Sequence, residues 1–234
     1  MKIIAINGSP RKGWNSTKLL EKWKEGVLSV LPDAEVQEVN LYDLDYKGCR
    51  SCFACKIKGG KFYGTCPIPD GAHDIIAAIK VADAVGIATP IYYCDLDAYA
   101  KCLLERVLFS VGQYSNPIKS LAPKKVSFTF LYSMNATKAQ SEQSGIEDRC
   151  RFMENALSMF YFMPPHHVSA YNTYQFTDYS KYVSDLFSEE DKRHQRDEQF
   201  PRDLQAAFDE GVKVAHEIQD ETVIGHSLDD VHRF

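Results

Sequence analysis

Short apolar runs alternate with helical patterns along most of this 234-residue chain. The runs predict five strands, at residues 3–7, 35–41, 84–88, 126–132 and 166–171. Helices are predicted between and after them, at 16–31, 72–81, 96–111, 147–162 and 204–218. Such alternation is typical of a parallel sheet covered by helices on both faces. With right-handed crossovers, we expect an α/β fold with a flavodoxin-like, doubly wound, five-stranded parallel sheet of order 2-1-3-4-5.

The length fits a single domain, which we place at residues 1–220. It includes a cysteine-bearing, irregular loop at 43–70 and an extended segment at about 136–200, which could serve a subunit contact or a lid. The part of that segment at 178–200 is polar and has no strong core pattern. Residues 221–234 are predicted to form a C-terminal tail.

Composition excludes some classes of partner. The net charge of −5 argues against a nucleic-acid binder, whose surface is normally basic. No apolar run approaches the roughly 18 residues that a membrane-spanning helix needs. The N-terminus has no signal-peptide pattern, so we expect a cytoplasmic protein that binds neither nucleic acid nor membrane.

The loop between the first strand and the first helix is rich in hydroxyl, amide and cationic side chains. In an α/β protein, unpaired N–H groups and the positive helix end converge at this junction, which favours phosphate. Trp14 and Asn15 stand where a triphosphate loop requires Lys and Ser/Thr, and no Gly-x-Gly-x-x-Gly is present. A single terminal phosphate therefore fits best. The candidate phosphate-binding residues are Ser9, Arg11, Asn15, Ser16 and Thr17. The alternative is an ordinary helix start with Asn15 or Ser16 as N-cap.

A second loop follows the third strand and contains Pro90, Ile91, Tyr92 and Tyr93. Two adjacent tyrosines at the point where the strand order reverses can flank a flat ring by stacking. Taken alone, they could equally be core or interface residues. Together with the first loop, they indicate a ligand that has a phosphate at one end and a planar ring at the other, which is the shape of flavin mononucleotide (FMN).

Several motifs resemble those of the NAD(P)H-dependent FMN reductases, a family that includes the iron–sulfur flavoproteins. They are Asn-Gly-Ser-Pro-Arg at 7–11, Asn-Ser-Thr at 15–17, Cys-x-x-Cys-x-x-Cys at 49–55, Thr-Pro-Ile-Tyr-Tyr at 89–93 and Leu-Glu-Arg at 104–106. The resemblance covers residues 1 to about 110. It implies that the loop at 9–17 holds the phosphate and ribityl chain, and that residues 90–93 line the isoalloxazine. It further implies that Ser133, Met134 and Asn135 close a third side.

The resemblance also implies an activity. A nicotinamide, NADH or NADPH, would give a hydride to FMN in a ping-pong cycle. A quinone, a nitro or azo compound, a metal ion or a protein would then take the electrons. No side chain is predicted to be catalytic in itself. Family members of this kind are commonly homodimers or homotetramers. A redox-sensing flavodoxin-like module without enzymatic activity is a further alternative.

Four clustered cysteines leave a second cofactor open. Cys49, Cys52 and Cys55 are spaced so that their thiolates can converge, and Cys66 could supply a fourth ligand. This pattern suits a [4Fe–4S] cluster or zinc. Ten residues separate Cys55 from Cys66, a wider spacing than in the iron–sulfur flavoproteins that the chain resembles. We therefore expect a metal-free loop, with an iron–sulfur electron-transfer protein as the alternative.

Overall fold

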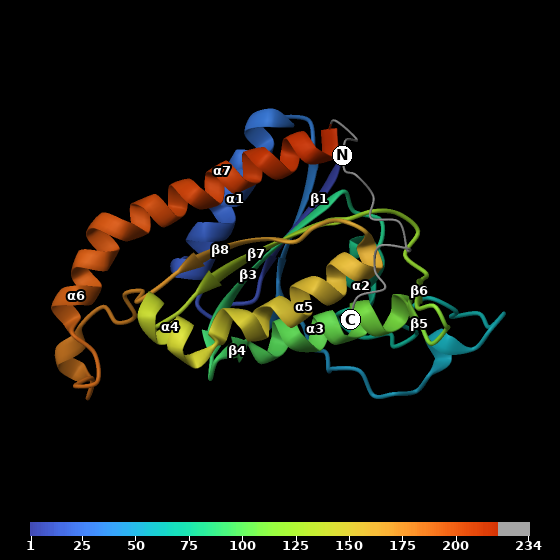
Figure 1. Ribbon diagram of the computed structural model, residues 1–234, viewed down its shortest axis with the longest axis horizontal. Helices are drawn as coiled ribbons and strands as arrows, with labels where there is room; N and C mark the ends of the chain where they lie inside the picture. The colour runs from blue at the N-terminus through green and yellow to red at the C-terminus, as the bar shows by residue number, and fades with distance from the viewer. Residues whose placement is uncertain (220–234) are drawn as a thin grey trace.

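The computed structural model describes residues 1–219, and the predicted tail at 221–234 lies outside them. Five parallel strands form one sheet in the order β2-β1-β3-β7-β8, which confirms the predicted 2-1-3-4-5 arrangement (Figure 1). The strands are β1 (Lys2–Asn7), β2 (Glu35–Asn40), β3 (Ala84–Tyr92), β7 (Ser127–Ser133) and β8 (His166–Ala170). Asn7 pairs with Ala88, and Pro90 pairs with Ser133. The carboxyl ends of β1, β3 and β7 therefore meet at one edge of the sheet.

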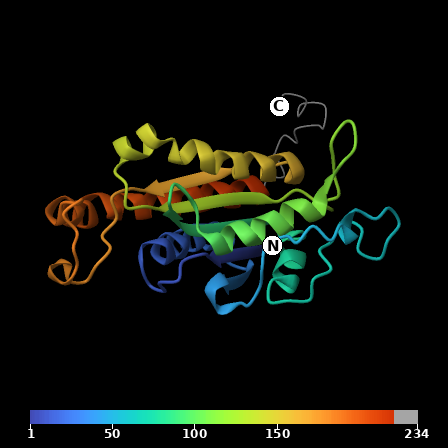
Figure 2. The same cartoon turned by 90° about the horizontal axis from the view of Figure 1, so that it is seen from below.

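Helices cover both faces of the sheet (Figures 1 and 2). One face packs against α2 (His73–Ile79), α3 (Ala98–Val111) and α5 (Ile146–Tyr161), and the other packs against α1 (Asn15–Val30) and α7 (Phe200–Gln219). The buried indole of Trp23 on α1 lies over Gly86 of β3, where a Cβ atom would approach the ring to 2.5 Å. The indole Nε1 donates to Thr129 Oγ1 at 3.1 Å, which fixes α1 across three strands.

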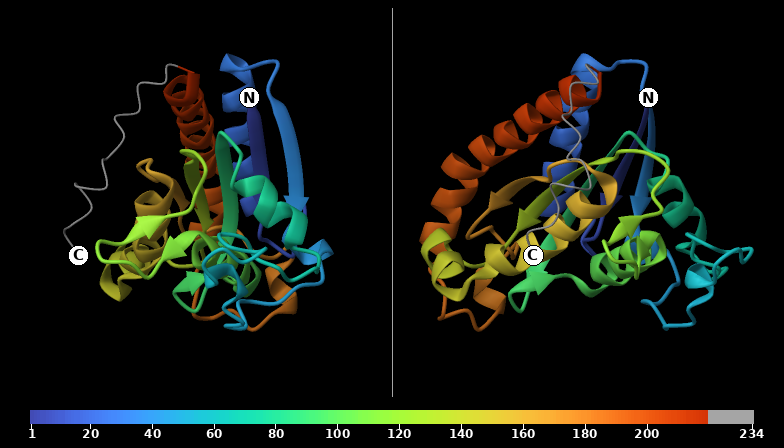
Figure 3. Two further views of the ribbon diagram at one scale, coloured as in Figure 1. Left: turned by 90° about the vertical axis from the view of Figure 1, so that its right-hand side faces the viewer. Right: turned by 45° about the vertical axis from the view of Figure 1, so that its right-hand side comes forward.

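The two helices on that second face cross closely, and the left view of Figure 3 shows them side by side. A Cβ atom on Gly26 would lie 2.0 Å from the carbonyl oxygen of Phe208, and one on Gly211 would lie 2.2 Å from that of Trp23. Only glycine permits this backbone approach, so the close crossing of α1 and α7 depends on Gly26 and Gly211.

Two element ends were predicted wrongly, and one helix was missed. The third strand does not end at 88, because β4 (Asp95–Leu96) folds back and pairs with Ile91 and Tyr92. The last helix begins at Phe200, not at residue 204, because Pro201 lies in its first turn, where no intrahelical N–H is needed. The polar stretch before it contains another helix, α6 (Glu189–His194).

Smaller elements complete the chain. They are the short pair β5 (Gly112–Gln113) and β6 (Lys119–Ser120), and α4 (Lys138–Ser144) with a Thr137 capping box. The cysteine loop at 43–70 and the segment at 171–199 lie at opposite ends of the molecule in Figure 1. Within residues 1–219, no helix is long and apolar enough to cross a bilayer.

Candidate functional site

The first turn of α1 is left without side-chain caps. The N-cap is Trp14, which makes no capping hydrogen bond, so the predicted N-cap at Asn15 or Ser16 is wrong. The two side chains are engaged elsewhere: Asn15 Nδ2 donates to the carbonyl oxygen of Tyr174 at 3.0 Å, and Ser16 Oγ lies 2.7 Å from Ser133 Oγ. The first N–H groups of α1 therefore stay available to a ligand, as the positive end of a helix requires for an anion.

The cationic group of this loop is Arg11. Its guanidinium carbon lies 3.4 Å from the ring centroid of Trp14, and Nη1 donates to the carbonyl oxygen of Gln175 at 2.7 Å. Lys12, the next residue, instead pairs with Asp43 at 2.6 Å. Arg11 therefore places one positive charge at the site, whereas the Lys12 ammonium is bound to Asp43.

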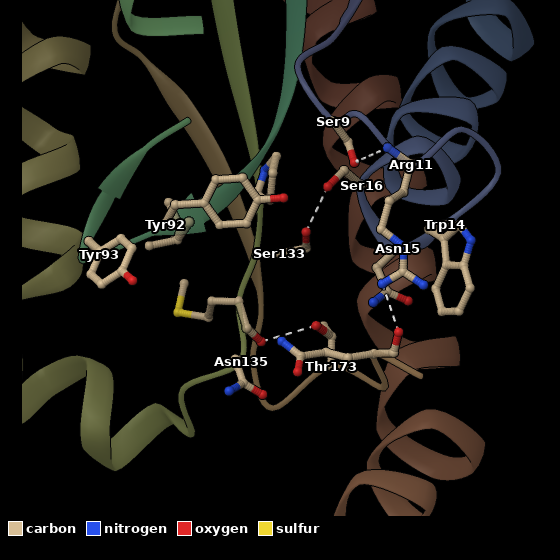
Figure 4. Close-up of a pocket in the computed structure, with 14 residues that line it drawn as sticks. Ser9, Arg11, Trp14, Asn15, Ser16, Tyr92, Tyr93, Ser133, Asn135 and Thr173 are labelled. Atoms are coloured by element: carbon tan, nitrogen blue, oxygen red, sulfur yellow. Dashed lines mark hydrogen bonds between the residues drawn. The ribbon is translucent and has the colours of Figure 1, made fainter. Parts of the chain in front are cut away.

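A cavity of about 240 Å³, which we call the switch-point cavity, opens between this loop and the ends of β3 and β7 (Figure 4). It is lined by Ser9, Arg11, Trp14, Asn15, Ser16, Pro90, Ile91, Tyr92, Tyr93, Ser133, Met134, Asn135, Thr173 and Gln175. Eleven of the twelve candidate residues from the sequence line it, and Thr17 does not. Figure 4 shows the arginine and tryptophan at one end and the two tyrosines at the other. The cavity is therefore polar and cationic at one end and aromatic at the other.

Three lining residues were missed from the sequence: Trp14, Thr173 and Gln175. Trp14 was used only to exclude a triphosphate loop, although its position beside Arg11 was a signal for stacking. The other two follow the carboxyl end of the last strand, at the same edge of the sheet as the predicted loops. That topological position was the signal for them.

The two tyrosines sit on a strained turn between β3 and β4. Tyr93 has φ 49° and Cys94 has φ 65°, and such left-handed conformations cost a non-glycine residue about 1–2 kcal/mol each. Tyr92 is partly covered, and Tyr93 is fully exposed to solvent. Burial raises the pKa of Tyr92, with Asp97 adding to the shift and Arg11 opposing it. The turn holds an aromatic ring out over the cavity at an energetic cost, which is typical of a functional position.

Two polar atoms at this site are buried without a hydrogen-bond partner in the described chain. They are Thr17 Oγ1, next to the lining residue Ser16, and Oδ1 of the lining residue Asn135. Buried polar groups are normally satisfied, so these two atoms are open to hydrogen bonds with a ligand. With the uncapped helix start, the single arginine and the exposed aromatic rings, the donor set fits a phosphate-bearing flavin.

The four clustered cysteines border one small cavity of about 20 Å³ in the 43–70 loop. Cys55 is buried, Cys49 and Cys66 are half-buried, and Cys52 is exposed. Burial raises the pKa of the Cys55 thiol, and Lys56 opposes that shift. Among residues 1–219, no three His, Cys, Asp or Glu side chains gather closely enough to hold a metal ion.

Three cations, two of them buried, hold this loop to the sheet domain. The guanidinium of Arg106 on α3 is fully buried. It pairs with both oxygens of Asp70, at 2.8 and 2.9 Å, and donates from Nε to Cys66 Sγ at 3.4 Å. Lys56 donates to the last carbonyls of α3, and Lys80 donates to the carbonyl of Gly64. Burial lowers the pKa of each of these two lysines. The loop is thus an anchored substructure.

Comparison with known proteins gives two kinds of likeness. The family model described as NADPH-dependent FMN reductase matches residues 1–144. An iron–sulfur flavoprotein from Archaeoglobus fulgidus is 33% identical over 124 residues, which cover 53% of this chain and 57% of that protein. One from Methanocaldococcus jannaschii is 32% identical over 107 residues, covering 45% and 51%. The chain thus spans about half the length of these curated relatives.

Solved structures match over nearly the whole chain. An NAD(P)H:quinone oxidoreductase from Methanothermobacter marburgensis gives a TM-score of 0.67 at 16% identity, covering 92% of this chain and 98% of that one. An azoreductase from Bacillus anthracis gives 0.64 at 13% identity, covering 93% and 99%. At these identities, the likeness establishes a shared fold.

Proposed function

The chain belongs to the NADPH-dependent FMN reductase family, and we propose that it is an FMN-dependent oxidoreductase. In this proposal NADH or NADPH supplies a hydride. A quinone, a nitro or azo compound, a metal ion or a protein then accepts the electrons. The solved structures with the same fold include proteins named for quinone and azo acceptors, which supports the small-molecule classes.

The observation that carries the proposal is the division of the switch-point cavity into a cationic end and an aromatic end. Arg11 and the uncapped first turn of α1 suit the dianionic phosphate, because charge-assisted hydrogen bonds to a phosphate are strong. Ser16 and Ser133 lie between the two ends and can donate to a polyol chain. Tyr92 and Tyr93 provide the flat surface for a ring.

Bound FMN supplies the redox chemistry in this proposal, by accepting a hydride and releasing electrons to a second substrate. The protein's part is to bind and orient it. The loop at 9–17 would hold the phosphate end, and Tyr92 and Tyr93 would flank the ring end.

Titration of the purified protein with FMN tests this proposal, with quenching of flavin fluorescence as the readout. The double variant Ser16→Ala/Thr17→Ala should bind FMN about 10- to 100-fold more weakly, because each of the two lost hydroxyl hydrogen bonds contributes about 0.5–1.5 kcal/mol. The control is Ser29→Ala, in which a hydroxyl bonded to the Gly26 carbonyl is removed at the other end of α1. Oxidation of NADH or NADPH by the loaded protein, with a quinone or an azo dye, then assays the activity. Failure of the wild type to bind FMN would refute the proposal and favour a module without flavin chemistry.

A second candidate is an iron–sulfur flavoprotein for electron transfer. It is favoured because all four clustered cysteines border the same cavity, and because the two relatives that match this chain over about half of their length carry that name. Cys49, Cys52, Cys55 and Cys66 would hold a [4Fe–4S] cluster. About four iron and four sulfide per chain in anaerobically purified protein would establish this candidate. Iron-free protein that still reduces an acceptor would exclude this candidate and support the FMN-dependent oxidoreductase without a cluster.

We also propose that the protein is a homodimer or a homotetramer. Large apolar side chains are exposed on several elements, including Tyr93, Tyr114 and Phe152. Isolated exposures of this kind are common, but three aromatic rings are candidates for a buried contact between subunits. Light scattering after size-exclusion chromatography measures the mass, and a mass near 26.5 kDa would exclude an oligomer.

A further inference from the structure

Lys192 on α6 is a fully buried lysine behind the wall of the switch-point cavity. Its Nζ donates to Asn172 Oδ1 at 2.8 Å and to the carbonyl oxygens of Asn135 and Thr173, each at 3.3 Å. The ring of Phe187 lies 5.0 Å from the same nitrogen. One ammonium group thus joins α6 to the loop after β7 and to the segment after β8.

None of the described groups that face this ammonium is acidic. They are two backbone carbonyls, one side-chain amide and one aromatic ring, and none of them titrates. Glu189, on the same helix, pairs with Arg193 at 2.8 Å and accepts from Tyr174. A buried charge without a counter-charge costs stability, and burial lowers the pKa of Lys192 to about 8. We therefore expect the Lys192 ammonium to serve a function that offsets this loss of stability.

The groups that Lys192 holds are part of the cavity wall. Asn135 and Thr173 both line the cavity. The two segments are already joined by backbone hydrogen bonds, from Asn172 N to the Ala136 carbonyl at 2.8 Å and from Thr173 N to the Met134 carbonyl at 2.9 Å. Lys192 binds the same junction and does not itself line the cavity. Its ammonium therefore determines how closely α6 and the rest of segment 171–199 are held against the wall.

We propose that Lys192 is a positioning residue for the flavin, whose ammonium latches segment 171–199 onto the loop at 134–136 and so holds the Asn135–Thr173 wall in its binding shape. The inference rests on the proposed function, because it takes the ligand of the cavity to be FMN. The latch needs the charged form, since only an ammonium has three protons to donate to three oxygens. FMN affinity should then fall as the pH rises through about 8, where Lys192 loses its proton.

The test compares three variants by FMN titration at about pH 7 and about pH 9. Lys192→Met keeps the apolar stem and removes the donors, and it should weaken FMN binding about tenfold or more at the lower pH. Lys192→Arg keeps the charge and should recover part of the affinity. Lys181→Met is the control, because Lys181 is an exposed lysine of the same segment that pairs with Asp178.

The pH profile separates positioning by charge from a general packing role. Wild type and Lys181→Met should bind FMN more weakly at the higher pH, whereas Lys192→Met should lose that dependence. If Lys192→Met does not fold, the wild-type profile and the Lys192→Arg affinity still decide the matter. Equal affinities and equal profiles for wild type and Lys192→Met would overturn the latch and leave FMN binding intact. A wild type that fails to bind FMN would instead refute the proposed function.

Discussion

Gly8 begins the loop that follows β1, and a methyl group has no room there. A Cβ atom would lie 2.6 Å from Asp97 Oδ2 and 3.1 Å from the carbonyl oxygen of Ala88. The Asp97 carboxylate cannot retreat easily. It is fully buried, it accepts from the backbone N–H groups of Tyr99 and Ala100 as the N-cap of α3, and it accepts from Thr89 Oγ1 at 2.7 Å.

Gly8→Ala should therefore destabilise the protein by about 3 kcal/mol or more. Overpacking a tight site costs about 1–3 kcal/mol, and weakening the Thr89 bond to a charged acceptor costs about 1.5–3 kcal/mol. This is a large part of the roughly 5–15 kcal/mol that stabilises a typical domain. With a urea m-value of about 3 kcal/mol/M, the unfolding midpoint should fall by about 1 M.

A double-mutant cycle isolates the steric cause. Asp97→Ser keeps an N-cap hydroxyl but removes the oxygen that the new methyl group would meet. In that background Gly8→Ala should cost at least about 1 kcal/mol less than in the wild type. Gly13→Ala is the control: it has φ +77° and no atom within 4 Å of its Cβ position, so it should cost about 1–2 kcal/mol in both backgrounds. A Gly8→Ala cost that is small, or equal in both backgrounds, would refute the reasoning.

Three further predictions concern the rest of the fold. Arg106→Met should lower the free energy of unfolding by about 3 kcal/mol, measured in urea, because it leaves Asp70 without its buried partner. His167→Gln should lower Tm more at about pH 5.5 than at about pH 8.5, since the hydrogen bond to Glu154 raises the pKa of His167. That stabilisation is complete below the unfolded-state pKa and is lost as the pH rises through the folded-state pKa, so equal Tm changes would contradict it. Gly211→Ala should lower Tm although alanine favours helix by about 1 kcal/mol, because its Cβ would lie 2.2 Å from a backbone oxygen of α1; a raised Tm would show that the crossing can relax.

Much of the site follows from the sequence because topology brings distant loops together. Once β1 and β3 are neighbours in a parallel sheet, the loops after them must share one edge, so Ser9 and Tyr92 could be assigned to one cavity from their positions along the chain. Thr17 was assigned by its hydroxyl alone. That hydroxyl is buried beside the lining residue Ser16, but it is not part of the cavity wall.

The errors come from contacts between segments far apart in the sequence. Asn15 has the composition of an N-cap, but its amide bonds to Tyr174, which only the folded segment 171–199 brings near. Thr173 and Gln175 line the cavity for the same reason. Strand β3 continues to Tyr92 because β4 pairs with its last residues, and no local periodicity signals that pairing. Propensity therefore predicts which elements exist, whereas tertiary pairing decides where they end.

Three lysines that bond to backbone carbonyls make it possible to follow the opening of each irregular segment chemically. Lys56 and Lys80 bond to backbone carbonyls at the cysteine loop, and Lys192 does so at segment 171–199. An amine held in this way reacts with an acylating reagent only after its segment opens. Because surface lysines are acylated at once, slow acylation read by peptide mass spectrometry times the opening of each segment separately. A ligand that closes the switch-point cavity should then slow the reaction at Lys192 and leave the rates at Lys56 and Lys80 unchanged.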